Sequence, residues 1–235
     1  MSTQGVCWDF LYQVDPTERW NAHFTLMIWK AFRQFIIPGS RALEIGCGPA
    51  SLAARSVLEL SCQSIASDID PMALDYAGLL AQTVGADIKC IRANGFCLPF
   101  HTGAFDTVFS SGVIEHFPCE QTERMVAEHA RVCKVGGHVL IAVPNLLNPV
   151  LTYHKLRTGR RYHAYPERSY TVWGLAELMR RHGLRPIGYT GFAPTIGFEW
   201  FIHSNFRLRW VDRHAPNWFL ALFGYEVLVA AKKVE

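Results

Sequence analysis

The stretch ALEIGCGPA, from Ala42 to Ala50, is the feature that most restricts how this chain can fold. It begins as a short apolar run, which Gly46 and Gly48 then interrupt. Glycine adopts positive φ at little steric cost and lets a ligand approach the backbone closely, while Pro49 suits the first turn of a helix. The stretch therefore predicts a buried strand, a tight ligand-binding turn and a helix, which together form the first unit of an open α/β sheet.

Strands and helices continue to alternate along the chain, and the strands are apolar throughout, as is typical of strands buried on both faces. The expected strands are 41–46, 64–70, 87–94, 105–111, 138–145, 184–192 and 223–233. The expected helices between them are 50–61, 71–85, 120–137 and 171–183. The fold class is therefore α/β, a Rossmann-like three-layer αβα sandwich around a mostly parallel sheet, with a helical and irregular cap.

Four segments divide the chain. Residues 1–37 are expected to form an N-terminal helical cap, because apolar residues recur at helical spacing between Trp8 and Phe35. Residues 38–145 form the ligand-binding core. Residues 146–170 are a basic and aromatic cap insertion, expected to be irregular from Asn148 onward, and residues 171–235 complete the sheet. That last segment includes a further cap segment at 193–223, to which the pattern assigns no element.

Composition argues against several classes of protein. The net charge of +3 is too small to indicate nucleic acid or a membrane as partner. No apolar run approaches the ~18 residues of a membrane span, and the first residues lack the pattern of a signal peptide. The seven cysteines show no C-x-x-C pair. We therefore expect reduced thiols, no metal and a cytoplasmic location. The expected oligomeric state is a monomer or homodimer.

Two classes of ligand fit a glycine turn after the first strand. A dinucleotide site prefers a third glycine, but Ser51 occupies that position. Glu44 would also repel a pyrophosphate, because phosphate sites recruit positive helix ends and bare amides. S-adenosyl-L-methionine instead carries an ammonium and a sulfonium, which a nearby carboxylate favours. The turn therefore favours this cationic nucleoside over a nicotinamide dinucleotide.

The ends of the next two strands supply the remaining parts of a nucleoside site. Asp68 ends the second strand, 20 residues after Gly48, at a spacing that suits a carboxylate bound to both ribose hydroxyls. Asp70 is better placed to begin the following helix. After the third strand, Asn94 can contact an adenine edge and Phe96 can pack on the adenine ring.

With these motifs the chain resembles a class I S-adenosylmethionine-dependent methyltransferase, and it is similar to the type 11-like small-molecule O-methyltransferases within that family. The resemblance rests on LEIGCGPA, SDIDPMAL, ANGFCLPF, FDTVFSSGVIEH, ARVCKVGGHVLIAVPN and GYEVLVAAKK. It implies a seven-stranded sheet whose last strand is antiparallel. The cofactor contacts that it implies are Glu44, Gly46, Cys47, Gly48, Asp68, Ile69, Asn94, Gly95, Phe96 and Ser111. Asn94 departs from the family pattern, where an aspartate is usual.

Methyl transfer is an in-line displacement, so the protein must mainly align the reactants and exclude water. A hydroxyl acceptor would also use a general base. His116, after the fourth strand, is the first candidate, although a structural hydrogen bond is its alternative role. His23 is the next candidate, followed by His154 and His163 in the cap segments. Glu115 is expected to be a solvated acid at the start of a helix.

Aromatic residues in the cap segments indicate the kind of acceptor. Tyr12, Trp20, Tyr153 and Tyr165 are expected to line a pocket for an apolar or ring-bearing small molecule, with core packing as the alternative. The basic run at 155–168 is consistent with a solvated face, a site for an anionic group or an RNA contact. The predicted function is methyl transfer to a small molecule. An RNA or protein methyltransferase and a catalytically silent cofactor-binding partner are the alternatives.

Overall fold

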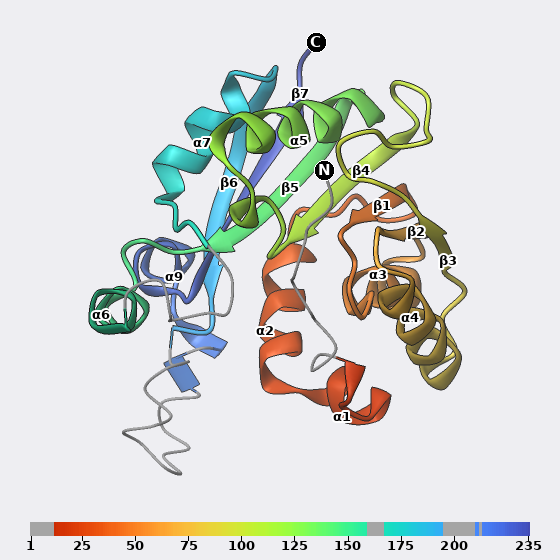
Figure 1. Ribbon diagram of the computed structural model, residues 1–235, viewed down its shortest axis with the longest axis horizontal. Coiled ribbons are helices and arrows are strands. Elements are labelled where there is room, and N and C mark those ends of the chain that lie inside the picture. The colour runs from red at the N-terminus through yellow and green to blue at the C-terminus, as the bar shows by residue number, and fades with distance from the viewer. Residues whose placement is uncertain (1–11, 159–166, 195–209, 212) are drawn as a thin grey trace.

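Seven strands form a single mixed sheet at the centre of the protein (Figure 1). The computed structural model describes residues 12–158, 167–194, 210–211 and 213–235. The strands are β1 (Arg41–Ile45), β2 (Gln63–Asp68), β3 (Lys89–Arg92), β4 (Phe105–Ser111), β5 (Cys133–Pro144), β6 (Leu184–Phe192) and β7 (Glu226–Lys233). Their order in the sheet is β3-β2-β1-β4-β5-β7-β6, and β7 runs antiparallel to both of its neighbours. The α/β fold class expected from the sequence is confirmed.

Helices cover both faces of this sheet (Figure 1). One face carries α2 (His23–Phe32), α3 (Ser51–Leu60) and α4 (Pro71–Val84), and the other carries α5 (Cys119–Val132) and α7 (Val172–Arg180). Side chains alternate between the two faces along each strand. Leu43 and Ile45 therefore pack in the large cluster with α5 and α7, while Ala42 packs with Phe32 of α2. No described helix is long and apolar enough to cross a membrane.

The N-terminal segment forms two helices where the sequence pattern suggested one. Helix α1 (Pro16–Asn21) begins at Asp15, whose side chain accepts hydrogen bonds from the backbone of Thr17 and Glu18. Ala22 has an extended backbone, with φ −57° and ψ 136°, so the chain turns there before α2 starts. The expected single helix is therefore wrong over this stretch, and its part before residue 12 lies outside the described residues.

Two other boundaries also differ from expectation. The helix expected to run to Gly137 ends at Val132, because Cys133 already pairs with Phe105 and begins β5. The segment expected to be irregular after Asn148 contains helix α6 (Pro149–Thr158). Asn148 starts this helix, since its side-chain oxygen accepts a hydrogen bond from the backbone of Leu151, which is fully buried. Capping and burial of Leu151 thus outweigh the weak apolar pattern of α6.

The antiparallel entry of β7 has a consequence for the site. It places the first residue of β7, Glu226, opposite Pro144 at the carboxyl end of β5. Asn145 fastens this edge, because its buried amide donates to the carbonyls of Ala221 and Gly224 at the end of helix α9 (Asn217–Phe223). Helices α6 and α9 lie beyond the tip of β5 (Figure 1). Residues near 111, 145 and 226 therefore meet at one edge of the sheet.

Candidate active site at the carboxyl edge of the sheet

The glycine turn after β1 is held in a conformation that only small residues adopt easily. Gly46 has φ +63° and Gly48 has φ +47°. A Cβ atom on Gly46 would lie 2.6 Å from Cγ2 of Val113, so the turn lies directly against the segment that follows β4. The backbone N–H of Cys47 donates to the carbonyl of Ser67, which ties the turn to β2. The Cys47 side chain is buried, and burial raises the pKa of its thiol well above the usual value.

Glu44 lies beneath this turn and is almost fully buried. Its Oε2 accepts a hydrogen bond of 2.8 Å from the backbone of Ala53, in the first turn of α3. Ala50 at the N-cap offers no side-chain acceptor, so the carboxyl group from β1 caps this helix. Burial raises the pKa of Glu44 to about 8, and the nearby charge of Asp68 adds to that rise. Attraction of a cationic ligand by Glu44 stays a prediction.

Asp68 lies at the end of β2, as expected, and faces the glycine turn. Its Oδ2 accepts a hydrogen bond of 2.9 Å from the backbone of Gly48, and its Oδ1 accepts one of 3.0 Å from Asp70. Burial raises the pKa of Asp68. Asp70 caps α4 by accepting from the backbone of Met72, which confirms the structural role that the sequence gave it. Ile69, between the two acids, is about half exposed.

The loop after β3 carries the predicted adenine contacts. The side-chain oxygen of Asn94 accepts a hydrogen bond of 3.0 Å from the backbone of Phe96, so the amide nitrogen is the part left to face a ligand. A Cβ atom on Gly95 would lie 3.2 Å from Met125 and 3.4 Å from Ile45, so this loop packs closely on the core. The Phe96 ring packs edge-on against the Phe117 ring, with 4.9 Å between the two ring centroids. Stacking of Phe96 on adenine stays a prediction.

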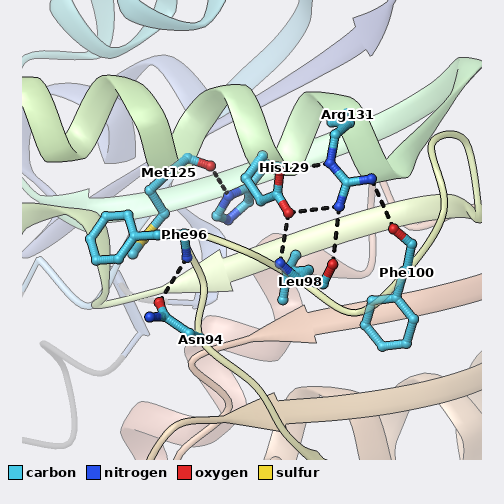
Figure 2. A network of polar contacts seen from close by, with 8 residues as sticks. Asn94, Phe96, Leu98, Phe100, Met125, His129 and Arg131 are labelled. Atoms are coloured by element: carbon cyan, nitrogen blue, oxygen red, sulfur yellow. Dashed lines mark hydrogen bonds and ion pairs between the residues drawn. The ribbon is translucent and has the colours of Figure 1, made fainter.

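An arginine on α5 holds this loop in place (Figure 2). Arg131 donates to the carbonyls of Leu98 and Phe100, at 3.1 and 2.8 Å. It also pairs with Glu128 at 2.7 Å, and Glu128 in turn accepts from the backbone of Leu98. Burial acts to raise the pKa of Glu128, but these hydrogen bonds leave it below the usual value. These contacts are not predicted from the sequence, where their only signal is the E-x-x-R spacing of Glu128 and Arg131 on a helix.

The tip of β4 differs most from what the sequence suggested. Ser111 donates to Oε2 of Glu226 at 3.2 Å, which joins β4 to the start of β7. Glu115, expected to be solvated, is only 3% exposed in the short 3₁₀ helix η2 (Ile114–His116). Glu115 is buried because η2 turns it back beneath Gly112, so that a Cβ atom there would lie 3.7 Å from Glu115 Oε1. His116 is partly exposed, and its Nε2 lies 3.8 Å from the same carboxylate oxygen.

Among the described substrate-lining candidates, Tyr12 and Trp20 pack against one buried cluster that contains Tyr76, whereas Tyr153 is not part of it. Tyr12 lies 5.7 Å from Tyr76 of α4, and Trp20 packs under the guanidinium of Arg55 at 3.8 Å. Tyr153 is exposed on α6, which lies away from α1 in Figure 1. Tyr165 and His163 lie outside the described residues, as does the side chain of His154. His23 begins α2 and is partly buried. The substrate-lining and catalytic roles of these residues stay predictions.

The strand order is that of a Rossmann-like sheet, and the predicted cofactor residues lie at the tips of β1, β2 and β4, on the carboxyl edge where such sheets bind ligands. Residues 43–141 match the family model described as a methyltransferase domain. Over 196 residues the chain is 29% identical to an uncharacterized methyltransferase of Mycobacterium sp. (strain KMS), which covers 81% of this chain and 72% of that protein. The chain is therefore similar to methyltransferases, and its core at residues 43–141 resembles the class I S-adenosylmethionine-dependent family.

Two further proteins, one similar in sequence and one in fold, differ in the acceptors that their names give. The chain is 32% identical to the probable tRNA methyltransferase 9B of Mus musculus, over 49% of this chain and 25% of that protein. Its fold is similar to that of magnesium protoporphyrin IX methyltransferase from Synechocystis PCC 6803 with bound SAH, at a TM-score of 0.64 and 16% identity. That match covers 96% of this chain and 92% of the other. The structural likeness shows a shared fold.

Proposed function

We propose that this protein transfers a methyl group from S-adenosyl-L-methionine to a small-molecule acceptor held beyond the tips of β4 and β5. In this proposal Asp68 binds the ribose hydroxyls, the amide of Asn94 contacts the adenine, and the backbone at Ser111 faces the amino-acid end of the cofactor. The observation that carries it is the hydrogen bond between Asp68 and Gly48, because it joins the predicted ribose acid to the glycine turn. When bound, the cofactor supplies a methyl group on a sulfonium, already activated for displacement.

The chain's own task is to place the acceptor in line with that methyl group and to keep water away. His116 is the proposed proton acceptor for a hydroxyl substrate, since it lies at the tip of β4 and remains partly exposed. A neutral imidazole is suited to this role near neutral pH.

A tRNA substrate is the second candidate, because of the similarity to tRNA methyltransferase 9B. RNA binding would need the basic run at 155–168 to face solvent. Arg157 is exposed, and residues 159–166 of this run lie outside the described residues. Lys155, however, donates to Glu167 and Ser169, and Arg168 donates to the carbonyl of Phe117 and to Cys119. These inward contacts favour a small molecule. A silent cofactor-binding role, a cytoplasmic location and a monomer or homodimer stay predictions.

Calorimetry with S-adenosylhomocysteine tests the cofactor part of this proposal. Asp68→Ala should weaken binding by roughly 10³-fold, because two charge-assisted hydrogen bonds to ribose contribute about 4 kcal/mol. Asp70→Ala is the matched control and should change the affinity by less than about threefold, since it removes only a helix cap. Equal affinities for the wild type and Asp68→Ala would refute the ribose role. Methyl transfer to tRNA, with none to small phenols or amines, would favour the second candidate.

A further inference from the structure

A pair of buried carboxyl groups, Glu115 and Glu226, lies beside the tip of β4. Glu115 is 3% exposed and Glu226 is 7% exposed, although one follows β4 and the other begins β7. Ser111 donates to Oε2 of Glu226. Within the described residues, Oε2 of Glu115 is buried and accepts no hydrogen bond. A buried carboxylate oxygen that accepts no hydrogen bond lowers the stability of the fold. Oε2 of Glu115 is therefore available to accept a hydrogen bond from a ligand.

Among the described residues, the charged side chains around this pair are mostly negative. Lys155 is a nearby ammonium, and its Nζ is already bonded to Glu167 and Ser169, at 2.7 and 2.6 Å. The guanidinium of Arg168 is directed to the carbonyl of Phe117 and the hydroxyl of Thr122. His116 adds a positive charge only when it is protonated. In the described part of the chain, the carboxyl groups of Glu115, Glu226 and Glu167 thus lie near one ammonium, that of Lys155. The guanidinium of Arg168 donates its hydrogen bonds to other groups.

The behaviour of the two acids agrees with this excess. Burial raises the pKa of Glu226 to about 7, and the charge of Glu167 adds to the rise. Burial, followed by the charge of Glu226, raises the pKa of Glu115 well above its usual value. Without a ligand the pair would therefore hold at least one proton near neutral pH, and a cation placed between the groups would displace it.

We propose that Glu115 and Glu226 bind the protonated amine of the methyl acceptor, so that the substrates are amines. Before transfer the ammonium gives one proton to this carboxyl pair, which frees the nitrogen lone pair. The nitrogen then forms its bond to the methyl carbon as the sulfonium S–C bond breaks and its electron pair stays on sulfur. This inference rests on the proposed function, since the pair marks the acceptor side of the same crevice. An ammonium brings both a positive charge and the N–H donor that Oε2 of Glu115 lacks. A hydroxyl brings the donor without the charge, and an anion is repelled by both acids. The contact between Gly46 and Val113 places this pair next to the cofactor turn.

The cofactor also carries an ammonium group, so the alternative is that the two acids bind the cofactor rather than the acceptor. If the two acids served the cofactor, neutralising them would weaken cofactor binding and leave the choice of acceptor unchanged. If they serve the acceptor, the affinity for S-adenosylhomocysteine is retained and the preference for amines is lost. Glu115→Gln and Glu226→Gln separate the two, because glutamine keeps the shape of the side chain and removes its charge.

The experiment compares matched amines and alcohols in the presence of saturating S-adenosylhomocysteine. The pairs are tyramine with tyrosol, phenethylamine with phenethyl alcohol, and hexylamine with hexanol, each titrated by calorimetry at pH 7.5. The wild type should bind the amine of at least one pair about tenfold more tightly than its alcohol. Glu115→Gln and Glu226→Gln should each reduce that preference to less than about threefold. Glu177→Gln, an exposed acid on α7 paired with Arg180, is the control and should keep it.

The outcomes distinguish this inference from the proposed function. Equal binding of amines and alcohols by the wild type, including failure of both to bind, overturns the inference, and no variant needs to fold for that result. A preference for amines that persists in both glutamine variants overturns it as well, as does a tenfold loss of S-adenosylhomocysteine affinity in either of them. A wild type that binds no S-adenosylhomocysteine refutes the proposed function itself.

Discussion

The two halves of the proposed site, which we call the cofactor side and the acceptor side, are built in different ways. On the cofactor side, at β1 and β2, the carboxyl groups of Glu44 and Asp68 accept hydrogen bonds from backbone N–H groups of the turns beside them. On the acceptor side, at β4 and β7, Glu226 meets the hydroxyl of Ser111, which is 115 residues away in the sequence. Glu115, beside it, keeps one buried oxygen without a donor among the described residues.

This difference indicates which half already has its ligand-binding conformation before a ligand binds. Backbone amides fixed by a turn cost little to organise and hold Asp68 in one orientation, so the cofactor side is preorganised. The acceptor side instead keeps one buried oxygen, Oε2 of Glu115, without a donor among the described residues, which destabilises the fold and leaves an interaction available to a substrate. Substitutions confined to one half therefore test the comparison, when their effects on the free energy of unfolding and on ligand affinity are measured.

The largest effect is expected from neutralising the acceptor side. The folded-state pKa of Glu226 is about 7, against 4.5 for an unperturbed glutamate. The folded state therefore binds the proton more tightly, and the stability gained from it is full below pH 4.5 and is lost as the pH rises through 7. Glu226→Gln should raise the free energy of unfolding at pH 8.5 by on the order of 3 kcal/mol.

Urea denaturation at pH 4.5 and pH 8.5 measures this effect. At pH 4.5 the folded forms of both proteins are neutral at this position and only the unfolded wild type is about half ionised, so their stabilities should agree within about 1 kcal/mol. Glu177→Gln, at an exposed position, should show no such dependence on pH. If Glu226→Gln were less stable than the wild type at pH 8.5, the acceptor side would not be strained in the way described.

A second test examines the rigidity of the cofactor side. Gly46→Ala should destabilise the protein by about 2–3 kcal/mol, because it puts a side chain at φ +63° and against Val113. Gly48→Ala is the control: its φ is also positive, but a Cβ atom there would meet nothing within 4 Å. It should cost about 1 kcal/mol.

Thermal denaturation of the double variant Gly46→Ala with Val113→Ala isolates the contact between the turn and the β4 segment. Removing the Val113 side chain should recover part of the loss caused by Gly46→Ala, about 1 kcal/mol. Strictly additive effects of the two substitutions would mean that the turn and the β4 segment do not touch in solution.

The smallest effect concerns the loop that joins the two halves. Arg131→Ala removes the clamp on the carbonyls of Leu98 and Phe100 and should cost about 1–2 kcal/mol. The affinity for S-adenosylhomocysteine should fall by a few fold, because the loop carries Asn94. Arg180→Ala breaks a similar i,i+3 pair on α7 and should cost less than about 0.5 kcal/mol. Equal losses in the two variants would remove the loop-fixing role of Arg131.

The parts that sequence reasoning predicted well are local. The strand end predicts the position of Asp68, and the proline after Asp70 predicts that Asp70 caps the next helix. The structure places both residues as expected. Helix α6 was missed because its start depends on Asn148 and its packing on Leu151, both of which are tertiary features. Glu115 was judged solvated because acids usually begin helices at the surface, whereas the turn at Gly112 folds it inward.

The sequence by itself determined the order of strands and helices, the glycine turn and the acids at the first two strand tips. Each of these depends on neighbouring residues, through backbone conformation, side-chain alternation and helix capping. Only the tertiary structure decided the acceptor side, where Ser111, Glu115 and Glu226 come together. The antiparallel entry of β7 brings the last of these to the tip of β4, and no local pattern encodes that meeting.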